Sequence, residues 1–233
     1  MKPDRPASPR RSAVTRPYGG VTAADRRKER HDRLMAAGLT VFGANGFHRS
    51  TVRDVCTEAG LTERYFYESF KTLLDLFNAV YMDLWTRLNQ HIQVARDQVP
   101  PHLPRLAQTE AAVTVWLNFL SDDRRRARIL LWDAFILHDM ERPTESQTDT
   151  DRDFSKRLYV LITTLFPDFP ALGVSPESLA AGVMGALIYM TKQWVQSGYA
   201  MSHDEAHKHI MLVLKATRAL YQELQAEAQR DRP

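Results

Sequence analysis

Apolar residues recur at three- and four-residue spacing along most of the chain, and no stretch keeps the apolar–polar alternation of a β-strand. Residues typical of helix starts and stops divide this pattern, such as Thr51 before one apolar run, Gly60 after it and Pro100 further on. The expected helices cover residues 23–45, 51–59, 62–70, 72–99, 109–120, 121–137, 154–166, 176–196 and 202–229. The sequence therefore predicts an all-α protein with about nine helices.

The apolar positions predict two separate cores. The first three helices are short and share one small core, formed by Leu34, Ala37, Val41, Phe42, Val52, Val55, Phe66 and Phe70. The run at residues 129–137 is apolar on nearly every side, which is typical of a helix buried inside a larger domain. The helix over residues 72–99 is long enough to connect the two.

Residues 51–70, TVRDVCTEAGLTERYFYESF, have the form of two short helices joined by a tight turn. Gly60 lies where a helix end often needs a left-handed backbone, which glycine adopts at little cost. Two helices of this length cannot bury a core alone, so other elements must present the second. A helix-turn-helix motif does this when its second helix enters the major groove of DNA. This stretch is therefore predicted to bind DNA.

The same stretch resembles the DNA-binding domain of the tetracycline-repressor (TetR) family of transcriptional regulators. The matching residues are Thr51, Ala59, Gly60, Leu61, Thr62, Phe66, Tyr67 and Phe70, with Ala36, Ala37, Phe42, Gly46 and Phe47 before them. The resemblance covers about residues 30–81, and beyond it only the number and order of helices agree. It implies a helix-turn-helix domain over residues 22–71 and an effector-binding and dimerisation domain over residues 72–233.

The positions that match the family identify candidate DNA contacts. They are Thr51, Arg53, Thr62, Glu63, Arg64, Tyr65, Tyr67 and Lys71. By this resemblance Thr51 and Tyr67 bind phosphate, Arg53 reaches a base or the backbone, and the residues from Thr62 to Tyr65 form the exposed start of the recognition helix.

Among these candidates Arg64 is expected to bind guanine, because its planar guanidinium matches two acceptors on one base edge. Glu63 is expected either to accept from cytosine or to support Arg64. The family usually has a phosphate-binding lysine at the position of Leu73, and leucine cannot replace it. Lys71, two residues earlier, is the expected substitute.

The resemblance further implies a homodimer, paired through the last two long helices, that binds a palindromic operator and is most often a repressor released by a small effector. Small residues over 181–186 and an apolar stripe of Ile210, Val213, Leu214 and Leu220 suit the dimer contact. Candidate effector contacts are Trp116, Phe119, Trp132, Phe135, Tyr159 and Tyr189, although aromatic residues at this spacing are also typical of a core. Few polar groups accompany them, among them Asp133, His138 and Gln193, which favours a hydrophobic or aromatic effector.

Positive charge gathers in the first third of the chain. Residues 1–80 contain 14 Lys and Arg against 9 Asp and Glu, whereas the whole chain has a net charge of only +3. Residues 1–21 are basic and Pro-rich with little to bury, so we expect a disordered arm that either attracts phosphate or has no role. A single cysteine, Cys56, suits a reducing cytosol, and no signal peptide or membrane span is expected. We therefore expect a cytoplasmic protein.

Other functions are weighed against regulation. His203, His207 and His209 could suggest a metal site, but the acids between them fit a capping box better, and no metal or cofactor is expected. The arginines at 124–128 could form a second nucleic-acid patch, although a solvated helix face is favoured. A small helical enzyme is disfavoured by the lack of a phosphate loop, nucleophile elbow or paired carboxylates. A regulator without an effector remains an alternative.

Overall fold

The computed structural model describes residues 22–133 and 176–230, and every regular element among them is helical. The α-helices are α1 (Ala23–Asn45), α2 (Val52–Ala59), α3 (Glu63–Ser69), α4 (Leu73–Asp97), α5 (Arg105–Ser121), α6 (Arg124–Arg128), α9 (Pro176–Gln196) and α10 (His203–Arg230). Two short elements accompany them, the 3₁₀ turn η1 (Phe47–Arg49) and the π-turn η2 (Ile129–Asp133). The all-α prediction is confirmed.

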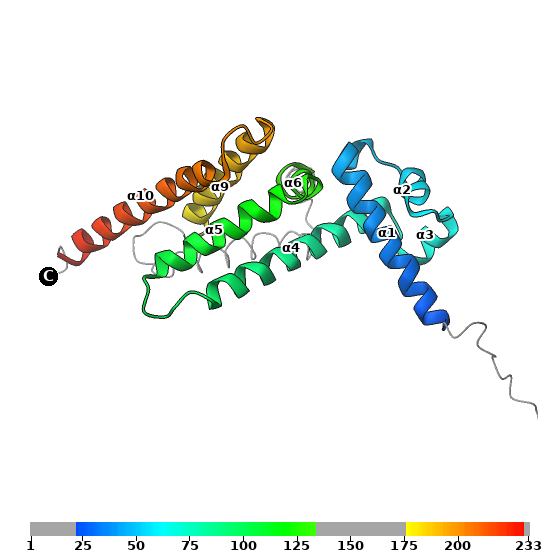
Figure 1. Ribbon diagram of the computed structural model, residues 1–233, viewed down its shortest axis with the longest axis horizontal. Coiled ribbons are helices and arrows are strands. Elements are labelled where there is room, and N and C mark those ends of the chain that lie inside the picture. The colour runs from blue at the N-terminus through cyan, green and yellow to red at the C-terminus, as the bar shows by residue number, and fades with distance from the viewer. Residues whose placement is uncertain (1–21, 134–175, 231–233) are drawn as a thin grey trace, which may run out of the picture.

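Helices α1, α2 and α3 form a compact domain at one end of the molecule (Figure 1). Its core contains the fully buried side chains of Leu34, Phe42, Val55 and Phe66, as the apolar pattern predicts. Phe47 from η1 completes this core, with its ring centroid 5.2 Å from that of Phe77 on α4. The domain is therefore packed directly onto the helix that follows it.

Three helix starts near this domain use the same capping box. In α1, α2 and α4 a threonine accepts from the backbone N–H of an aspartate three residues later, and that aspartate accepts from the threonine N–H. The threonines are Thr22, Thr51 and Thr72. These boxes explain why the predicted helix starts agree closely with the observed ones.

Helix α4 runs from the small domain into the larger one, where α5 packs along it and α9 and α10 lie on the far side of α5 (Figure 1). The stripe of Leu76, Phe77, Val80, Leu84 and Leu88 on α4 is buried. The expected helix over 72–99 is thus observed at residues 73–97, and the helix expected at 109–120 begins four residues earlier, at Arg105.

The predicted helix over 121–137 differs from the observed chain. Asp123 caps the five-residue α6, and the chain then widens into η2. The remainder of that prediction, the helix expected at 154–166 and the arm expected at 1–21 lie outside the described residues. No described helix is long and apolar enough to cross a membrane.

Candidate DNA-binding surface and helical hollow

The candidate DNA contacts lie together on α2, α3 and the residues that flank them. Seven of the eight are exposed and Tyr65 is half-buried. We call this set the recognition surface, with the members Thr51, Arg53, Thr62, Glu63, Arg64, Tyr65, Tyr67 and Lys71. The Arg64 side chain is 84% exposed, which leaves its guanidinium accessible to a base edge. The opposite side of α3 is anchored in the core by Phe66.

Ion pairs beneath the recognition surface orient its side chains. Glu68 lies 3.4 Å from Nε of Arg64 and 3.5 Å from Nη2 of Arg30 on α1. The guanidinium of Arg30 also stacks over the ring of Tyr65, 4.5 Å from its centroid. The acid that supports Arg64 is therefore Glu68, one helical turn later, and the alternative role considered for Glu63 is not observed.

The turn between α2 and α3 is held by two residues. Gly60 adopts the left-handed conformation at φ +61°, as the sequence predicts. Arg33 on α1 donates from Nε to the Ala59 carbonyl at 3.1 Å and from Nη2 to the Gly60 carbonyl at 3.2 Å. Arg33 could not be predicted from the sequence, because no local pattern links it to a turn 26 residues away.

Two threonines of the recognition surface differ in what their hydroxyls do. The Thr51 hydroxyl is engaged in its capping box, donating to Asp54 at 2.7 Å and accepting from the Asp54 N–H. Thr62 occupies the N-cap position of α3, but its side chain makes no capping hydrogen bond. At the position of the family lysine, Leu73 is half-buried against the core, while Lys71 is exposed.

The arginines of α6 bind neighbouring groups of the same molecule. Arg125 pairs with Asp123 at 2.8 Å, and Arg126 donates to the Phe119 carbonyl at 3.1 Å. Arg124 stacks over the ring of Tyr199. These arginines therefore contact groups of the same chain, so the helix face is neither surrounded by solvent alone nor a basic patch without partners.

The predicted effector contacts are placed in different surroundings. Trp116 and Phe119 are buried, and the Trp116 indole N–H donates to the Thr191 hydroxyl at 3.0 Å. Trp132 is half-buried, with the ammonium of Lys192 at 5.6 Å from its ring centroid. Phe135, Tyr159 and His138 lie outside the described residues. Tyr189 is 64% exposed, and the effector contacts remain predictions.

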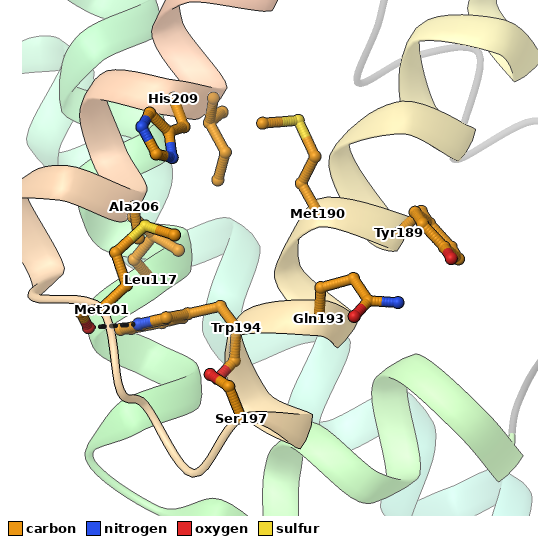
Figure 2. A pocket seen from close by; sticks show the side chains of 10 residues that line it. Leu117, Tyr189, Met190, Gln193, Trp194, Ser197, Met201, Ala206 and His209 are labelled. Atoms are coloured by element: carbon orange, nitrogen blue, oxygen red, sulfur yellow. Dashed lines mark hydrogen bonds between the residues drawn. The ribbon is translucent and has the colours of Figure 1, made fainter.

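A hollow of about 420 Å³ opens between α5, α9 and α10. Its lining is mainly apolar and consists of Leu117, Tyr189, Met190, Gln193, Trp194, Ser197, Met201, Ala206, His209 and Ile210. Figure 2 shows Met190 extending toward α10, while Tyr189 and Gln193 extend from α9 away from it. The Trp194 indole N–H donates to the Met201 carbonyl at 2.8 Å, which fixes the ring that forms the floor. The hollow could receive an apolar group.

The surroundings of the α10 histidines and of Cys56 bear on whether these residues form a metal site or a reactive thiol. Ser202 and Glu205 form the expected capping box of α10, with the Ser202 N–H 2.9 Å from the carboxylate. Within residues 22–133 and 176–230 no three His, Cys, Asp or Glu side chains are grouped as a metal site would require. Burial raises the pKa of the Cys56 thiol, with a smaller contribution from Glu63, which disfavours the reactive thiolate.

Comparisons with known proteins agree with this arrangement. Residues 34–80 match the profile of the bacterial regulatory proteins of the tetR family. The chain is 22% identical over 203 residues to the HTH-type transcriptional activator FasR of Mycolicibacterium smegmatis, covering 84% of this chain and 87% of that protein.

Two solved structures have a similar fold. A TetR-like transcriptional regulator from Rhodococcus sp. RHA1 has a TM-score of 0.60 at 19% identity, covering 82% of this chain and 96% of that one. The regulator FadR from Bacillus subtilis, in complex with stearoyl-CoA, has a TM-score of 0.60 at 14% identity, covering 79% and 97%. At these identities the likeness shows the fold.

Proposed function

We propose that this protein is a homodimeric repressor that binds a palindromic operator and is released by a small, largely hydrophobic effector. The proposal starts from the family: the chain belongs to the tetR family of bacterial regulatory proteins and is a transcriptional regulator. The observation that carries this proposal is the recognition surface. Its polar side chains are exposed on a short helix whose other side is anchored by the buried Phe66. Such a helix is positioned to enter a major groove.

Within the recognition surface the proposed roles follow from side-chain chemistry. Arg64 reads guanine through two donors, and Glu68 orients it. Thr62, Glu63 and Tyr65 lie beside it at the start of α3. Tyr67, Thr51 and Lys71 contact the phosphate backbone on either side, which sets the register of α3 in the groove, and Arg53 reaches a base or the backbone.

The proposed dimer contact is the outer face of α9 and α10. Large apolar side chains are exposed on these helices, with Tyr189 at 64%, Leu212 at 67% and Leu220 at 58%. Ile210 and Leu214 of the predicted stripe are instead buried within the chain. Gly182 has no atom within 4 Å of an added Cβ, so another helix has room to approach it. A second copy on this face would cover the apolar side chains and present two recognition helices related by a two-fold axis, which predicts a palindromic operator.

The effector is proposed to be largely hydrophobic because the hollow of the larger domain has an apolar lining. The stearoyl-CoA of the Bacillus subtilis FadR structure supports a long-chain acyl compound as the first to test. Stearoyl-CoA and free coenzyme A would be added to the protein–DNA complex in parallel. Release by the acyl compound alone supports a hydrophobic effector, whereas equal release by both would contradict it.

The deciding experiment is selection of duplexes from a randomised pool by the full chain at near-physiological salt. We expect a palindrome with two half-sites. Arg64→Ala should then relax preference at one base pair by about 1–3 kcal/mol, whereas Lys71→Ala should weaken binding evenly across sequences. Arg87→Ala is the matched control, because Arg87 is an exposed arginine on α4 paired with Asp83. Sequence-independent binding by the unaltered chain would refute the proposal.

Activation is the second candidate function, favoured by the relative FasR, which is named a transcriptional activator. Transcription from a template that carries the selected duplex decides between the two. A repressor lowers transcript yield when added, and an activator raises it. Either result leaves the proposed DNA contacts unchanged.

A further inference from the structure

The short α6 packs against α1 (Figure 1), and η2, which directly follows α6, is hydrogen-bonded to the connection that leads to α2. Arg125 donates from Nη1 to the Thr40 hydroxyl at 3.0 Å, and Arg128 donates from Nη2 to the Asn45 carbonyl at 3.2 Å. Gly43 permits this approach, because a Cβ there would lie 2.8 Å from Cα of Arg125. The larger domain therefore contacts the DNA-binding domain by a route separate from α4.

At the centre of this contact is one peptide group, that between Gly46 and Phe47. Its N–H donates to Oδ2 of Asp133 at 3.2 Å, and its carbonyl accepts from the Ser50 hydroxyl at 2.7 Å. Gly46 has φ +80° and ψ 159°, a conformation that side chains strongly disfavour, so this peptide orientation is built into the chain. Both polar ends of the peptide are thus bound by specific side chains.

Asp133 is an unusual residue to find in this position. It is only 4% exposed, although a carboxylate is costly to bury. Burial raises its pKa, while the Phe47 amide, Arg128 and His48 act in the opposite direction. A buried carboxylate with these partners is held by specific interactions rather than by chance packing.

We propose that Asp133 is a positioning residue, which binds the Gly46–Phe47 peptide and so sets the orientation of α2 and α3 relative to the larger domain. The inference rests on the proposed function and concerns how the two domains communicate. Ser50 directly precedes Thr51, the first member of the recognition surface. A shift of η2 would therefore be transmitted through one peptide group to the start of α2.

The geometry of η2 supports this role. A π-turn is rare, and it occurs mostly as a single insertion in a helix near functional sites. Because it has more residues per turn than an α-helix, a return to α-helical geometry would rotate Asp133 away from the peptide. Such a return would supply the second arrangement that transmission between domains requires.

The test compares Asp133→Ala with Asp133→Asn, which retains an acceptor oxygen for the Phe47 amide. The first measurement is hydrogen exchange of the backbone amides in the full chain. Asp133→Ala is expected to speed exchange of the Phe47 amide about tenfold or more, because the hydrogen bond to a charged acceptor is lost. Asp133→Asn is expected to stay within a few-fold of the unaltered chain.

The second measurement is DNA binding with the two half-sites moved one base pair closer or further apart. Asp133→Ala is expected to reduce discrimination between these spacings by about 2- to 30-fold. Ser50→Ala, which frees the other end of the same peptide, should act in the same direction. Val113→Ala is the control, because it opens space in the buried core of α5 away from this contact and should leave spacing preference unchanged.

Unchanged exchange of the Phe47 amide in Asp133→Ala would overturn the inference. So would unchanged spacing preference in both Asp133→Ala and Ser50→Ala, or an equal loss in Asp133→Asn. If the unaltered chain selects no palindrome, the proposed function fails separately, and hydrogen exchange still decides whether Asp133 holds this peptide.

Discussion

The close packing around α1 predicts that one glycine of this helix cannot accept a methyl group whereas another can. At Gly43 an added Cβ would overlap Cβ of Arg125 and lie 2.8 Å from its Cα, a backbone atom of α6. At Gly38 the nearest atoms are Val80 Cγ2 at 3.1 Å and Leu76 Cδ2 at 3.3 Å, both at the ends of side chains that can move. The same substitution thus meets backbone in one case and side chains in the other.

The expected change in unfolding free energy is the difference between two opposing contributions. Replacing glycine by alanine inside a helix gains about 0.5–1 kcal/mol in either position. Overpacking a tight contact costs about 1–3 kcal/mol, and at Gly43 carbon atoms normally about 3.5–4 Å apart are brought much closer. We therefore expect Gly43→Ala to destabilise the protein by about 1–2 kcal/mol. Gly38→Ala should remain within about 1 kcal/mol of the unaltered chain.

Urea unfolding followed by far-UV circular dichroism measures both variants, at one protein concentration because a dimer gains stability from association. Gly43→Ala should also reduce discrimination between half-site spacings, since α6 must move away from α1 to make room. A Gly43→Ala variant as stable as Gly38→Ala would show that α6 yields without cost. The contact between Gly43 and Arg125 would then not fix the position of the two domains relative to each other.

Three further outcomes are expected. Arg33→Met should cost about 1 kcal/mol of unfolding free energy and weaken operator binding, because the turn carbonyls lose their donor. Arg27→Met is the exposed control. Thr51→Ala should cost about 1 kcal/mol by urea unfolding, whereas Thr62→Ala should cost less and lower operator affinity in a binding titration, because only Thr51 makes a capping bond. Burial raises the folded-state pKa of Asp133, so its charge costs stability near neutral pH. The unaltered chain should therefore gain stability relative to Asp133→Asn as pH falls from about 7 toward about 4. A constant difference between the urea midpoints of the two proteins over this range would contradict this.

The sequence predicted what depends on neighbouring residues. The start of α1 at Ala23 follows from a capping box within four residues, and the left-handed Gly60 follows from its place after an apolar run. Arg33 could not be predicted to bind the turn, because its partners are 26 and 27 residues away. Asp133 is 86 residues from Phe47, and its neighbours suggested a buried apolar helix in which Asp133 would be a polar group of the effector site. Contacts of this kind exist only after the helices have packed.

Because the partners of a side chain cannot be read from its sequence neighbours, a run of arginines is a poor guide to DNA contact in this chain. The run at 124–128 has the higher density of positive charge, yet Arg125 and Arg126 bind Asp123 and a backbone carbonyl, so their charge is already satisfied. Arg64 is isolated in the sequence, and its side chain is 84% exposed with one orienting acid at its inner edge. A base-reading arginine must keep its outer donors available while its orientation is limited, which Glu68 achieves. Exposure and partners, rather than local charge density, therefore single out Arg64 for the proposed DNA contact.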